Sequence, residues 1–302
     1  MRVLVSGASG LIGSALVPYL EGRGHTVAKL VRREVDGVRW DPAARTIDRA
    51  ALSRFDAVIH LSGESVLARW TPAKQAAIRA SRVDSTAFLA GVLVALDRKP
   101  AVLVTASAIG YYGDRADEIL TEDSPPGAGF LADVCRAWEA AAEPATRAGI
   151  RTVQLRIGLP LTAAGGILGQ LLLPFRLGLG GPVGRGAQWW SWIALEDLLG
   201  LFALALDTTS LSGPVNGTAP HPVTNRDFAA TLGRVLGRPA FLPVPPVALR
   251  LLFGTAAANG AMLTGCRVQP ARAVTAGFRF AYPDLEPALR RALALAGGAG
   301  RR

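Results

Sequence analysis

The chain begins with an alternation of two hydrophobic patterns that continues to about residue 156. Short apolar runs rich in β-branched residues predict strands at Val3–Val5, Thr26–Val31, Ala57–Leu61, Val102–Thr105 and Thr152–Leu155. Between them, helical spacing of apolar positions predicts helices at Leu11–Glu21, Pro72–Leu96 and Phe130–Ala148. Strands that alternate with helices in this way are typical of βαβ units and predict a parallel sheet.

The pattern changes after Gly158. Connections rich in glycine and proline, centred on GLGGPVGRG, separate helical patches at Leu195–Leu206, Asn225–Leu236 and Val247–Ala257. We therefore expect an α/β protein in which residues 1–157 form a Rossmann-type, doubly wound parallel sheet. Residues 158–296 would form a smaller C-terminal α+β substrate lobe, with segments free to return to the sheet, and residues 297–302 a flexible tail.

Composition narrows the class of protein. Half of the 302 residues are hydrophobic and 19% are charged, so the chain can bury a large core as one domain with a lobe or as two domains. The net charge of +10 comes from 30 arginines and 3 lysines spread over the whole length. A nucleic-acid partner is not favoured, because such proteins concentrate positive charge in a patch or stripe.

Cysteine and histidine are too sparse to predict a disulfide framework or a metal centre. Cys135 and Cys266 lie far apart, and the three histidines are scattered along the chain. The N terminus lacks the three-part pattern of a signal peptide, and the leucine-rich stretch 166–179 is too short for a membrane span and contains Arg176. We expect a cytoplasmic protein with no metal and no membrane partner.

The string VLVSGASGLIG predicts a dinucleotide site at the first strand-to-helix turn. Gly7, Gly10 and Gly13 stand where such a site needs a tight turn, close approach of backbone to a pyrophosphate, and close packing of helix on strand. A purely structural glycine turn is the alternative. The preceding strand and the following helix favour the cofactor interpretation.

The end of the second predicted strand bears on the choice of dinucleotide. An Asp or Glu there would bind the ribose 2′-hydroxyl of NAD, but the strand is followed by Arg32 and Arg33. Guanidinium groups suit a phosphate, so NADP is favoured. Glu34 keeps NAD open if the strand end is misplaced by two residues.

The segment ASAIGYYG after the fourth predicted strand of the sheet, together with FLADVCRAWEAAAE, resembles the extended short-chain dehydrogenase/reductase family. In that family a Ser or Thr and a Tyr-x-x-x-Lys pair act on a carbonyl or alcohol beside the nicotinamide, because the lysine charge lowers the pKa of the tyrosine. Ser107 matches the position of that serine, and Ala108 is the alternative match. The Tyr and Lys positions fall on Leu131 and Cys135, and no lysine follows Lys99.

Most of the chain resembles an atypical branch of that superfamily, the NAD(P)-dependent epimerase family with a C-terminal domain of unknown function. LSGES, SRVDST, LPFRLGLGGPVGRGAQWWSW, GPVNGTAPHPVTNRDF and PARAVTAGFRFAYPDL carry this resemblance besides the strings above. It implies NADP as cofactor. The predicted cofactor residues are Gly7, Ser9, Gly10, Leu11, Ile12, Gly13, Val31, Arg32, Arg33, Leu61, Ser62, Gly63, Glu64, Arg82 and Leu159.

The chain also departs from the branch pattern. Where the family usually shows WIHxDDL, the sequence reads WIALEDL with Ala194 and Glu196, and Cys266 stands where Gln is common. If the missing histidine assisted catalysis, that role is lost; if it packed locally, little changes. The aromatic group Trp189, Trp190 and Trp192 is interpreted as packing rather than as a substrate wall.

The remaining candidates for proton donation are Ser107, Tyr111 and Tyr112, with Glu64 and Glu122 as weaker ones. We predict an NADP-dependent oxidoreductase that transfers hydride to or from a small organic substrate without the Tyr–Lys pair. A non-catalytic NADP-binding sensor or scaffold is one alternative, and a sugar-nucleotide-like epimerase or dehydratase is another. The expected partner is a small-molecule substrate, and a homodimer is left open.

Overall fold

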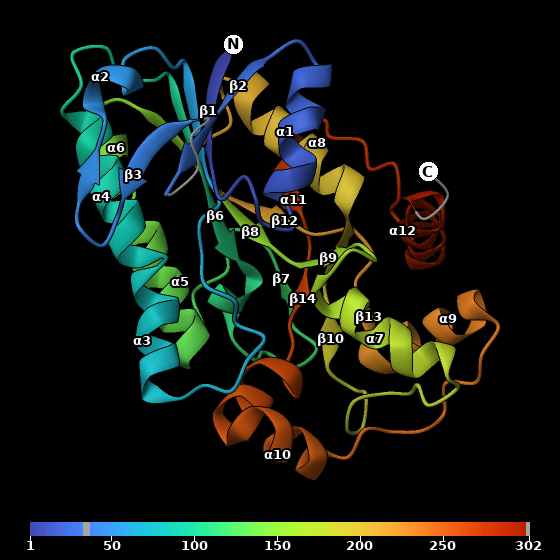
Figure 1. The fold of residues 1–302 in the computed structure, drawn as a ribbon. Helices are drawn as coiled ribbons and strands as arrows, with labels where there is room; N and C mark the ends of the chain where they lie inside the picture. Colours follow the sequence, from blue (N-terminus) through green and yellow to red (C-terminus); the bar gives the residue numbers. More distant parts are fainter. Residues whose placement is uncertain (33–36, 300–302) are drawn as a thin grey trace.

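An eight-stranded sheet organises the computed structural model, which describes residues 1–32 and 37–299 (Figure 1). Its strand order is β12-β8-β6-β5-β1-β2-β3-β4, and every neighbouring pair is parallel except β3 with β4. The strands are β1 (Arg2–Ser6), β2 (Thr26–Val31), β3 (Val38–Asp41), β4 (Thr46–Ile47), β5 (Ala57–His60), β6 (Val102–Ala108), β8 (Arg151–Ile157) and β12 (Gly213–Gly217). The predicted Rossmann-type parallel sheet is confirmed.

Helices cover both faces of this sheet. On one face α1 (Gly13–Gly22) and α8 (Leu195–Asp207) pack on the core that contains Val3, Val104 and Val153. On the other face α2 (Arg49–Leu52), α4 (Val83–Val94) and α6 (Glu143–Arg147) enclose a second core around Leu4 and Leu103. Figure 1 shows the two layers on opposite sides of the strands. Alternate residues of each central strand therefore feed two separate cores.

Two segments predicted as single helices are each divided. Pro72–Leu96 forms α3 (Pro72–Ala80) and α4, with Ser81 and Arg82 at the break, where the Ser81 hydroxyl donates to the carbonyl of Ile78. Phe130–Ala148 forms α5 (Phe130–Ala140) and α6, because Pro144 has no N–H with which to continue the helical hydrogen bonding.

Short elements follow β6 before the chain returns to the sheet. They are the 3₁₀ turn η1 (Ile109–Tyr112) and β7 (Ile119–Leu120), which pairs with the distant β14 (Arg267–Val268). Strand β12 comes from the part of the chain assigned to the lobe and lies at the edge of the main sheet beside β8. The last helix, α12 (Leu285–Ala299), extends into the predicted tail.

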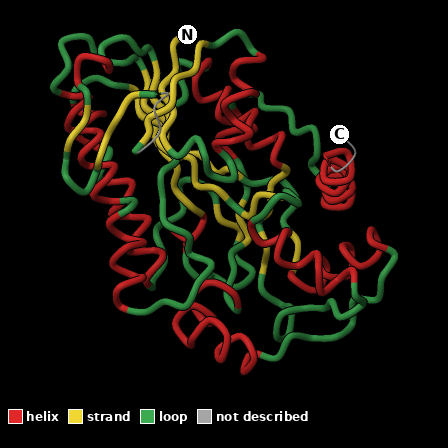
Figure 2. Tube along the Cα trace, viewed as in Figure 1, coloured by secondary structure: helices red, strands yellow, loops and turns green. Residues whose placement is uncertain are grey.

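The C-terminal lobe lies beside the carboxyl ends of the strands (Figure 2). Its core is formed by α7, α9, α12 and short strands that include β9 and β11. The remaining bounds are β9 (Leu159–Leu161), α7 (Gly166–Arg176), β10 (Trp189–Trp190), β11 (Trp192–Ala194), β13 (Val223–Thr224), α9 (Asn225–Leu236), α10 (Pro246–Ala257), η2 (Ala258–Met262) and α11 (Ala271–Thr275). Within residues 1–32 and 37–299, no helix has both the length and the hydrophobicity needed to cross a membrane.

Candidate functional site

The glycine loop between β1 and α1 has the geometry of a cradle. Gly7 has φ +67°, and a Cβ on Gly13 would lie 2.2 Å from the carbonyl oxygen of Gly7, so neither position accepts a side chain without strain. The backbone N–H groups of Leu11 and Ile12 have no hydrogen-bond partner among the described residues, and Ser9 and Gly10 are exposed. These free donors at a helix N terminus fit a pyrophosphate.

Positive side chains surround the carboxylate of Glu64, beyond the end of β5. Lys74 forms an ion pair with Glu64, and the pKa of Glu64 is lowered by this hydrogen bond and by the charges of Lys74, Arg82 and Arg32. Arg32, exposed directly after β2, is thereby placed near the loop that follows β5. The predicted Arg33 lies outside the described residues. This excess of cations fits the phosphate end of a dinucleotide.

Arg82 lies at the α3–α4 break and reaches the same loop. One guanidinium nitrogen donates to the carbonyls of Glu64, at 2.8 Å, and Ile78, at 3.3 Å. The guanidinium carbon of Arg82 lies 5.2 Å from the centroid of the Trp138 ring. The same carbon would lie 3.3 Å from a Cβ placed on Gly63. The α3–α4 break thus turns a cation toward the segment after β5.

The other predicted cofactor residues lie on both sides of this opening. Val31 is buried at the end of β2, and Leu61 and Ser62 are half-buried directly after β5. The backbone of Leu61 lies against Gly7, where an added Cβ would come within 2.9 Å of its carbonyl carbon. Leu159 begins β9 and pairs with Trp192 of β11. Apart from Arg82 at the α3–α4 break, the predicted cofactor residues that the structure describes therefore lie at or after the ends of β1, β2 and β5 and, with Leu159, just after β8, at the carboxyl edge of the main sheet.

A buried histidine holds the glycine loop from beneath, and sequence reasoning did not identify it. His60 Nδ1 lies 2.6 Å from Ser6 Oγ, and Nε2 lies 3.2 Å from Ser85 Oγ. Because the Ser85 hydroxyl donates to the carbonyl of Ser81, Nε2 must donate to Ser85 and Nδ1 must accept from Ser6. Burial lowers the pKa of His60 to about 4, which matches this neutral form.

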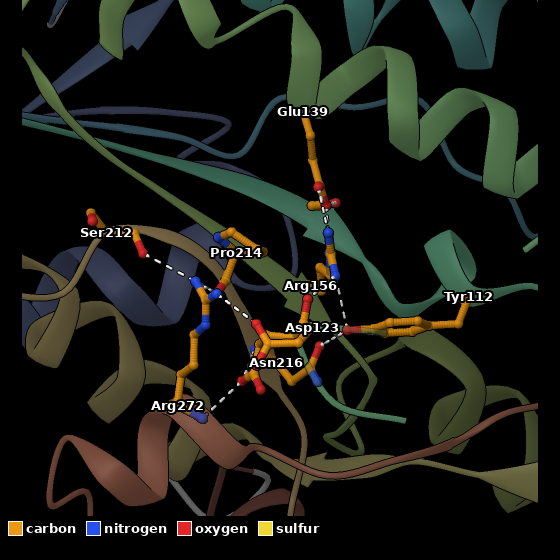
Figure 3. Close-up of polar contacts among 10 residues, drawn as sticks. Tyr112, Asp123, Glu139, Arg156, Ser212, Pro214, Asn216 and Arg272 are labelled. Atoms are coloured by element: carbon orange, nitrogen blue, oxygen red, sulfur yellow. Dashed lines mark hydrogen bonds and ion pairs between the residues drawn. The ribbon is translucent and has the colours of Figure 1, made fainter. Parts of the chain in front are cut away.

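The predicted catalytic serine is part of a buried ion-pair network, of which Figure 3 shows Glu139, Arg156 and Tyr112. Ser107, at the end of β6, donates to Glu139 of α5 at 2.6 Å. Both oxygens of Glu139 accept from Arg156 of β8 at 2.8 Å, a bidentate pair whose arginine side chain is 3% exposed. The hydroxyl of Ser107 therefore donates its hydrogen bond to the Glu139 carboxylate, which already pairs with a buried arginine.

Tyr112 continues the same network toward β12. Its hydroxyl accepts from Arg156 at 2.9 Å and donates to Asn216 Oδ1 at 2.7 Å, as Figure 3 shows. The side chain is fully buried, and desolvation raises the pKa of Tyr112 to about 12. Glu122 accepts from the backbone N–H groups of Asn216 and Arg272. Both hydrogen-bonding roles of the Tyr112 hydroxyl are thus filled by protein groups.

Tyr111 is the predicted proton donor that keeps some exposure. The guanidinium carbon of Arg156 lies 3.5 Å from the centroid of its ring, and the ring meets Tyr112 edge to face. Its hydroxyl has no hydrogen-bond partner within the described ranges. Arg156 contacts Tyr111 and Tyr112 directly and Ser107 through Glu139, but Ser107 and Tyr112 are buried beneath the surface and Tyr111 is half-buried.

The positions that correspond to the Tyr–Lys pair form an apolar wall. Leu131 packs in a cluster with Val66 and Phe130, and Cys135 is 3% exposed. Desolvation raises the pKa of Cys135 to about 12, so its thiol stays protonated near neutral pH. A Cβ on Gly110 would lie 3.2 Å from Leu131 and 3.8 Å from the sulfur, which places η1 against this wall.

The positions where the chain departs from the family pattern are structural. Ala194 is buried in the core of the lobe, and Glu196 forms an ion pair with Arg291 of α12. Cys266 is buried against Tyr112 and Leu120. Ala194 and Glu196 therefore lie within the lobe, whereas Cys266 packs against η1 and β7.

The tryptophans also pack the lobe for the most part. Trp192 is fully buried, Trp190 packs on Phe228, and Trp189 donates to Asp117 and lies under Arg267. Across the described part of the chain, no group of three or more His, Cys, Asp or Glu side chains could hold a metal ion.

Two protein-family models match the chain. The model described as the NAD dependent epimerase/dehydratase family matches residues 3–216. The chain belongs to this family. A second model, a domain of unknown function (DUF1731), matches residues 244–292. Both halves of the resemblance drawn from the sequence are confirmed, and family membership supports a nicotinamide cofactor.

Relatives in the epimerase family span the full length of the chain. Epimerase family protein SDR39U1 of Homo sapiens is 38% identical over 300 residues, covering 97% of this chain and 100% of the relative. Epimerase family protein Mb2239 of Mycobacterium bovis is 40% identical over 291 residues, covering 95% and 96%. The similarity therefore includes the lobe as well as the sheet.

Solved structures agree with this assignment. The crystal structure of human epimerase family protein SDR39U1 (isoform2) with NADPH superposes with a TM-score of 0.87 at 35% identity, covering 97% of this chain and 99% of that one. MoeE5 in complex with UDP-glucuronic acid and NAD has a TM-score of 0.81 at 20% identity, covering 99% and 100%, and supports the fold alone.

Replacing Glu139 tests the importance of the buried pair. Glu139→Gln keeps the shape of the side chain but leaves the Arg156 charge without its carboxylate, so we expect the free energy of unfolding to fall by about 3 kcal/mol or more. Urea unfolding at pH 7 measures it. Asp133→Asn, which removes an exposed ion pair with Arg136 on the same helix, is the control and should cost about 1 kcal/mol or less. Equal losses would contradict a special role for the buried pair.

His60 predicts a pH dependence of stability. Its pKa is lowered from 6.5 to about 4 in the folded state, so below pH 6.5 the unfolded chain binds a proton that the folded chain does not. Stability should therefore fall as the pH drops from 6.5 toward 4, by on the order of 2 kcal/mol at pH 5. Urea unfolding of wild type and His60→Asn at pH 7 and pH 5 measures this loss. The variant should have the smaller one, and an unchanged pH dependence would rule out His60 as its source.

Proposed function

We propose that the protein is an NADP-dependent oxidoreductase that transfers hydride between the nicotinamide and a small organic substrate needing little acid assistance. The observation that carries this proposal is the combination of an open dinucleotide cradle with an apolar wall at the usual proton-transfer positions. Gly7 and Gly13 shape the cradle, while Leu131 and Cys135 form the wall. When bound, the cofactor supplies or accepts the hydride.

The choice of NADP is supported by the charges beyond β2 and β5. Arg32 follows β2 directly, and Lys74 and Arg82 lie around Glu64 in the neighbouring loop. A 2′-phosphate carries negative charge that these side chains would pair with, whereas the free 2′-hydroxyl of NAD prefers a carboxylate. The human relative was crystallised with NADPH.

The substrate class is supported by the small number of hydroxyls that remain free to donate a proton among the described residues. The hydroxyls of Ser107 and Tyr112 are used within the buried network, and Tyr111 is the remaining candidate for a donor to an oxygen that gains charge. An iminium ion is reduced to an amine by hydride alone, and an activated enone gives a delocalised enolate whose α-carbon can take its proton from water. A simple ketone needs a proton donor as its oxygen becomes an alkoxide.

A non-catalytic role as an NADP-binding sensor or scaffold is the second candidate. It is favoured by the same buried network, because Arg156 and Glu139 are arranged for stability rather than for proton exchange. Catalytic turnover distinguishes the sensor or scaffold from the oxidoreductase. A sensor would bind the dinucleotide and show no reaction with any substrate class.

Substrate profiling tests the proposed reaction. Purified protein with NADPH should reduce a cyclic iminium compound or an activated enone and leave simple ketones unchanged. The reason is that the iminium compound and the enone do not need a proton donor supplied by the protein. Oxidation of NADPH followed by its absorbance, with product analysis, measures this. Tight NADPH binding without turnover of any of these compounds would contradict the oxidoreductase and favour the sensor.

Replacing Arg32 tests the choice of dinucleotide. Arg32→Ala should weaken NADPH binding about tenfold or more and leave NADH binding nearly unchanged, because only NADPH offers the phosphate that the guanidinium pairs with. Calorimetric titration measures both affinities. Lys29→Ala, which removes an exposed cation from the strand that precedes Arg32, is the control. Equal losses for NADPH and NADH in Arg32→Ala would overturn the assignment of NADP.

A further inference from the structure

Large hydrophobic side chains are exposed together on the C-terminal lobe. Most of the exposed large hydrophobic residues in the described part of the chain lie in two stretches, 173–179 and 241–252. Single exposed hydrophobic residues are ordinary on a protein surface, but a group of them marks a contact surface. We call this group the apolar patch, and its members are Leu173, Leu177, Leu179, Phe241, Leu242, Val247, Leu251 and Leu252.

The stretch after α7 and the stretch before α10 run side by side. The N–H of Leu242 donates to the carbonyl of Gly180 at 3.1 Å, and the N–H of Val244 donates to the carbonyl of Pro182 at 2.8 Å. Helix α10 begins directly after this pairing and occupies the lower end of the molecule in Figure 1. The two stretches of the apolar patch therefore adjoin on the surface of the lobe.

Helix α10 turns an apolar face to solvent. Leu249 is buried in a small core with Val183. Val247 and Leu251 stand four residues apart on the opposite side of the helix, and Leu252 lies beside them. Leu251 is 72% exposed and Leu252 is 69% exposed. A surface helix normally carries polar residues on the face opposite its core contact, so the outer face of α10 is suited to contact with an apolar phase.

The part of the chain that carries the apolar patch is purely cationic. Residues 144–195 and 228–283 contain no aspartate or glutamate. Arg176 at the end of α7, Arg238 before the second stretch and Arg250 on α10 are exposed. None of the three takes part in an ion pair among residues 1–32 and 37–299. Their charges are therefore available to an anionic partner.

A further arginine reaches α10 from the loop before α3. Arg69 donates to the carbonyl of Leu251 at 2.5 Å. The helix is interrupted nearby at Gly254, which has φ +81°, and a Cβ on this glycine would lie 3.3 Å from the Arg69 side chain. A guanidinium is thereby held beside the most exposed leucine of the apolar patch. Hydrophobic and cationic side chains are thus neighbours on this surface.

Exposed leucines beside arginines favour a membrane surface over other partners. The bases of a nucleic acid stack on aromatic rings, and Phe241 is the one aromatic residue of the apolar patch. A second copy of the chain would bring like charges together at the interface. A bilayer that contains anionic lipids accommodates both kinds of side chain, because aliphatic groups enter its apolar region and arginines bind headgroup phosphates.

We propose that the apolar patch docks the protein on the surface of a membrane that contains anionic lipids, with the leucines of α10 inserted among the headgroups. The helix would lie in the plane of the interface, because only its outer face is free to enter the bilayer. The expected lack of a membrane partner concerned a spanning segment, whereas this contact is peripheral. It does not depend on the proposed hydride transfer.

Vesicle co-sedimentation tests the proposal. The protein should sediment with vesicles of phosphatidylcholine and phosphatidylglycerol and stay in solution with phosphatidylcholine alone, because only the mixed vesicles carry negative charge. Leu251→Ser should weaken binding to the mixed vesicles about tenfold, since one inserted leucine is lost. Leu295→Ser, the same change at an exposed position of α12, is the control and should bind as wild type does.

Folding and oligomeric state are measured on the same proteins. Because the Leu251 side chain is mostly exposed, Leu251→Ser should unfold at the wild-type temperature; if it does not, Leu177→Ser, at a 65% exposed position after α7, takes its place in the vesicle assay. No binding to the mixed vesicles, or equal binding of the patch variant and wild type, would overturn the proposal. A wild-type dimer that the patch variant converts to monomers in sedimentation velocity would assign the apolar patch to a second copy and would also overturn it.

Discussion

A buried cation at position 156 is the constraint on which the centre of the molecule depends. Arg156 is 3% exposed near the carboxyl end of β8, the strand beside the sheet's edge, and a buried guanidinium is stable only when its donors are satisfied. Glu139 of α5, Tyr112 of η1 and the carbonyl of Glu122 supply the acceptors. Since these groups come from three separate segments, one charge sets the position of helix α5, the turn after β6 and the loop that follows β7.

This constraint changes what the end of β6 can do. In the extended dehydrogenase pattern the residues there exchange protons with a substrate, which requires hydroxyls that are open to it. Here Ser107 donates to Glu139, and the Tyr112 hydroxyl is occupied on both sides by Arg156 and Asn216. The network therefore uses within the protein the hydroxyls that the extended dehydrogenase pattern offers to a substrate.

Local patterns were enough to predict five strands of the main sheet, the glycine turn and helix α9, whose bounds match Asn225–Leu236. They were not enough for β12, because GPVNG is short and becomes a strand only by pairing with β8. The roles of Arg156 and Glu139 depend on a contact between positions 17 residues apart that periodicity does not report. One signal was present: the alternation in RTVQLRI marks a strand with a polar face, unusual within a parallel sheet.

The last point concerns the positive charge near the position of the missing lysine. In the family pattern it provides a positive charge near the nicotinamide and lowers the pKa of the tyrosine. Arg82 reaches the neighbourhood of Cys135 from the α3–α4 break and stacks near Trp138, so a positive charge lies beside the position of the missing lysine. A guanidinium binds phosphates and hydroxyls but does not exchange protons near neutral pH. Under the proposed function, the charge and the proton transfer that one lysine combines in the family pattern would be separated in this chain, with Arg82 supplying only the charge.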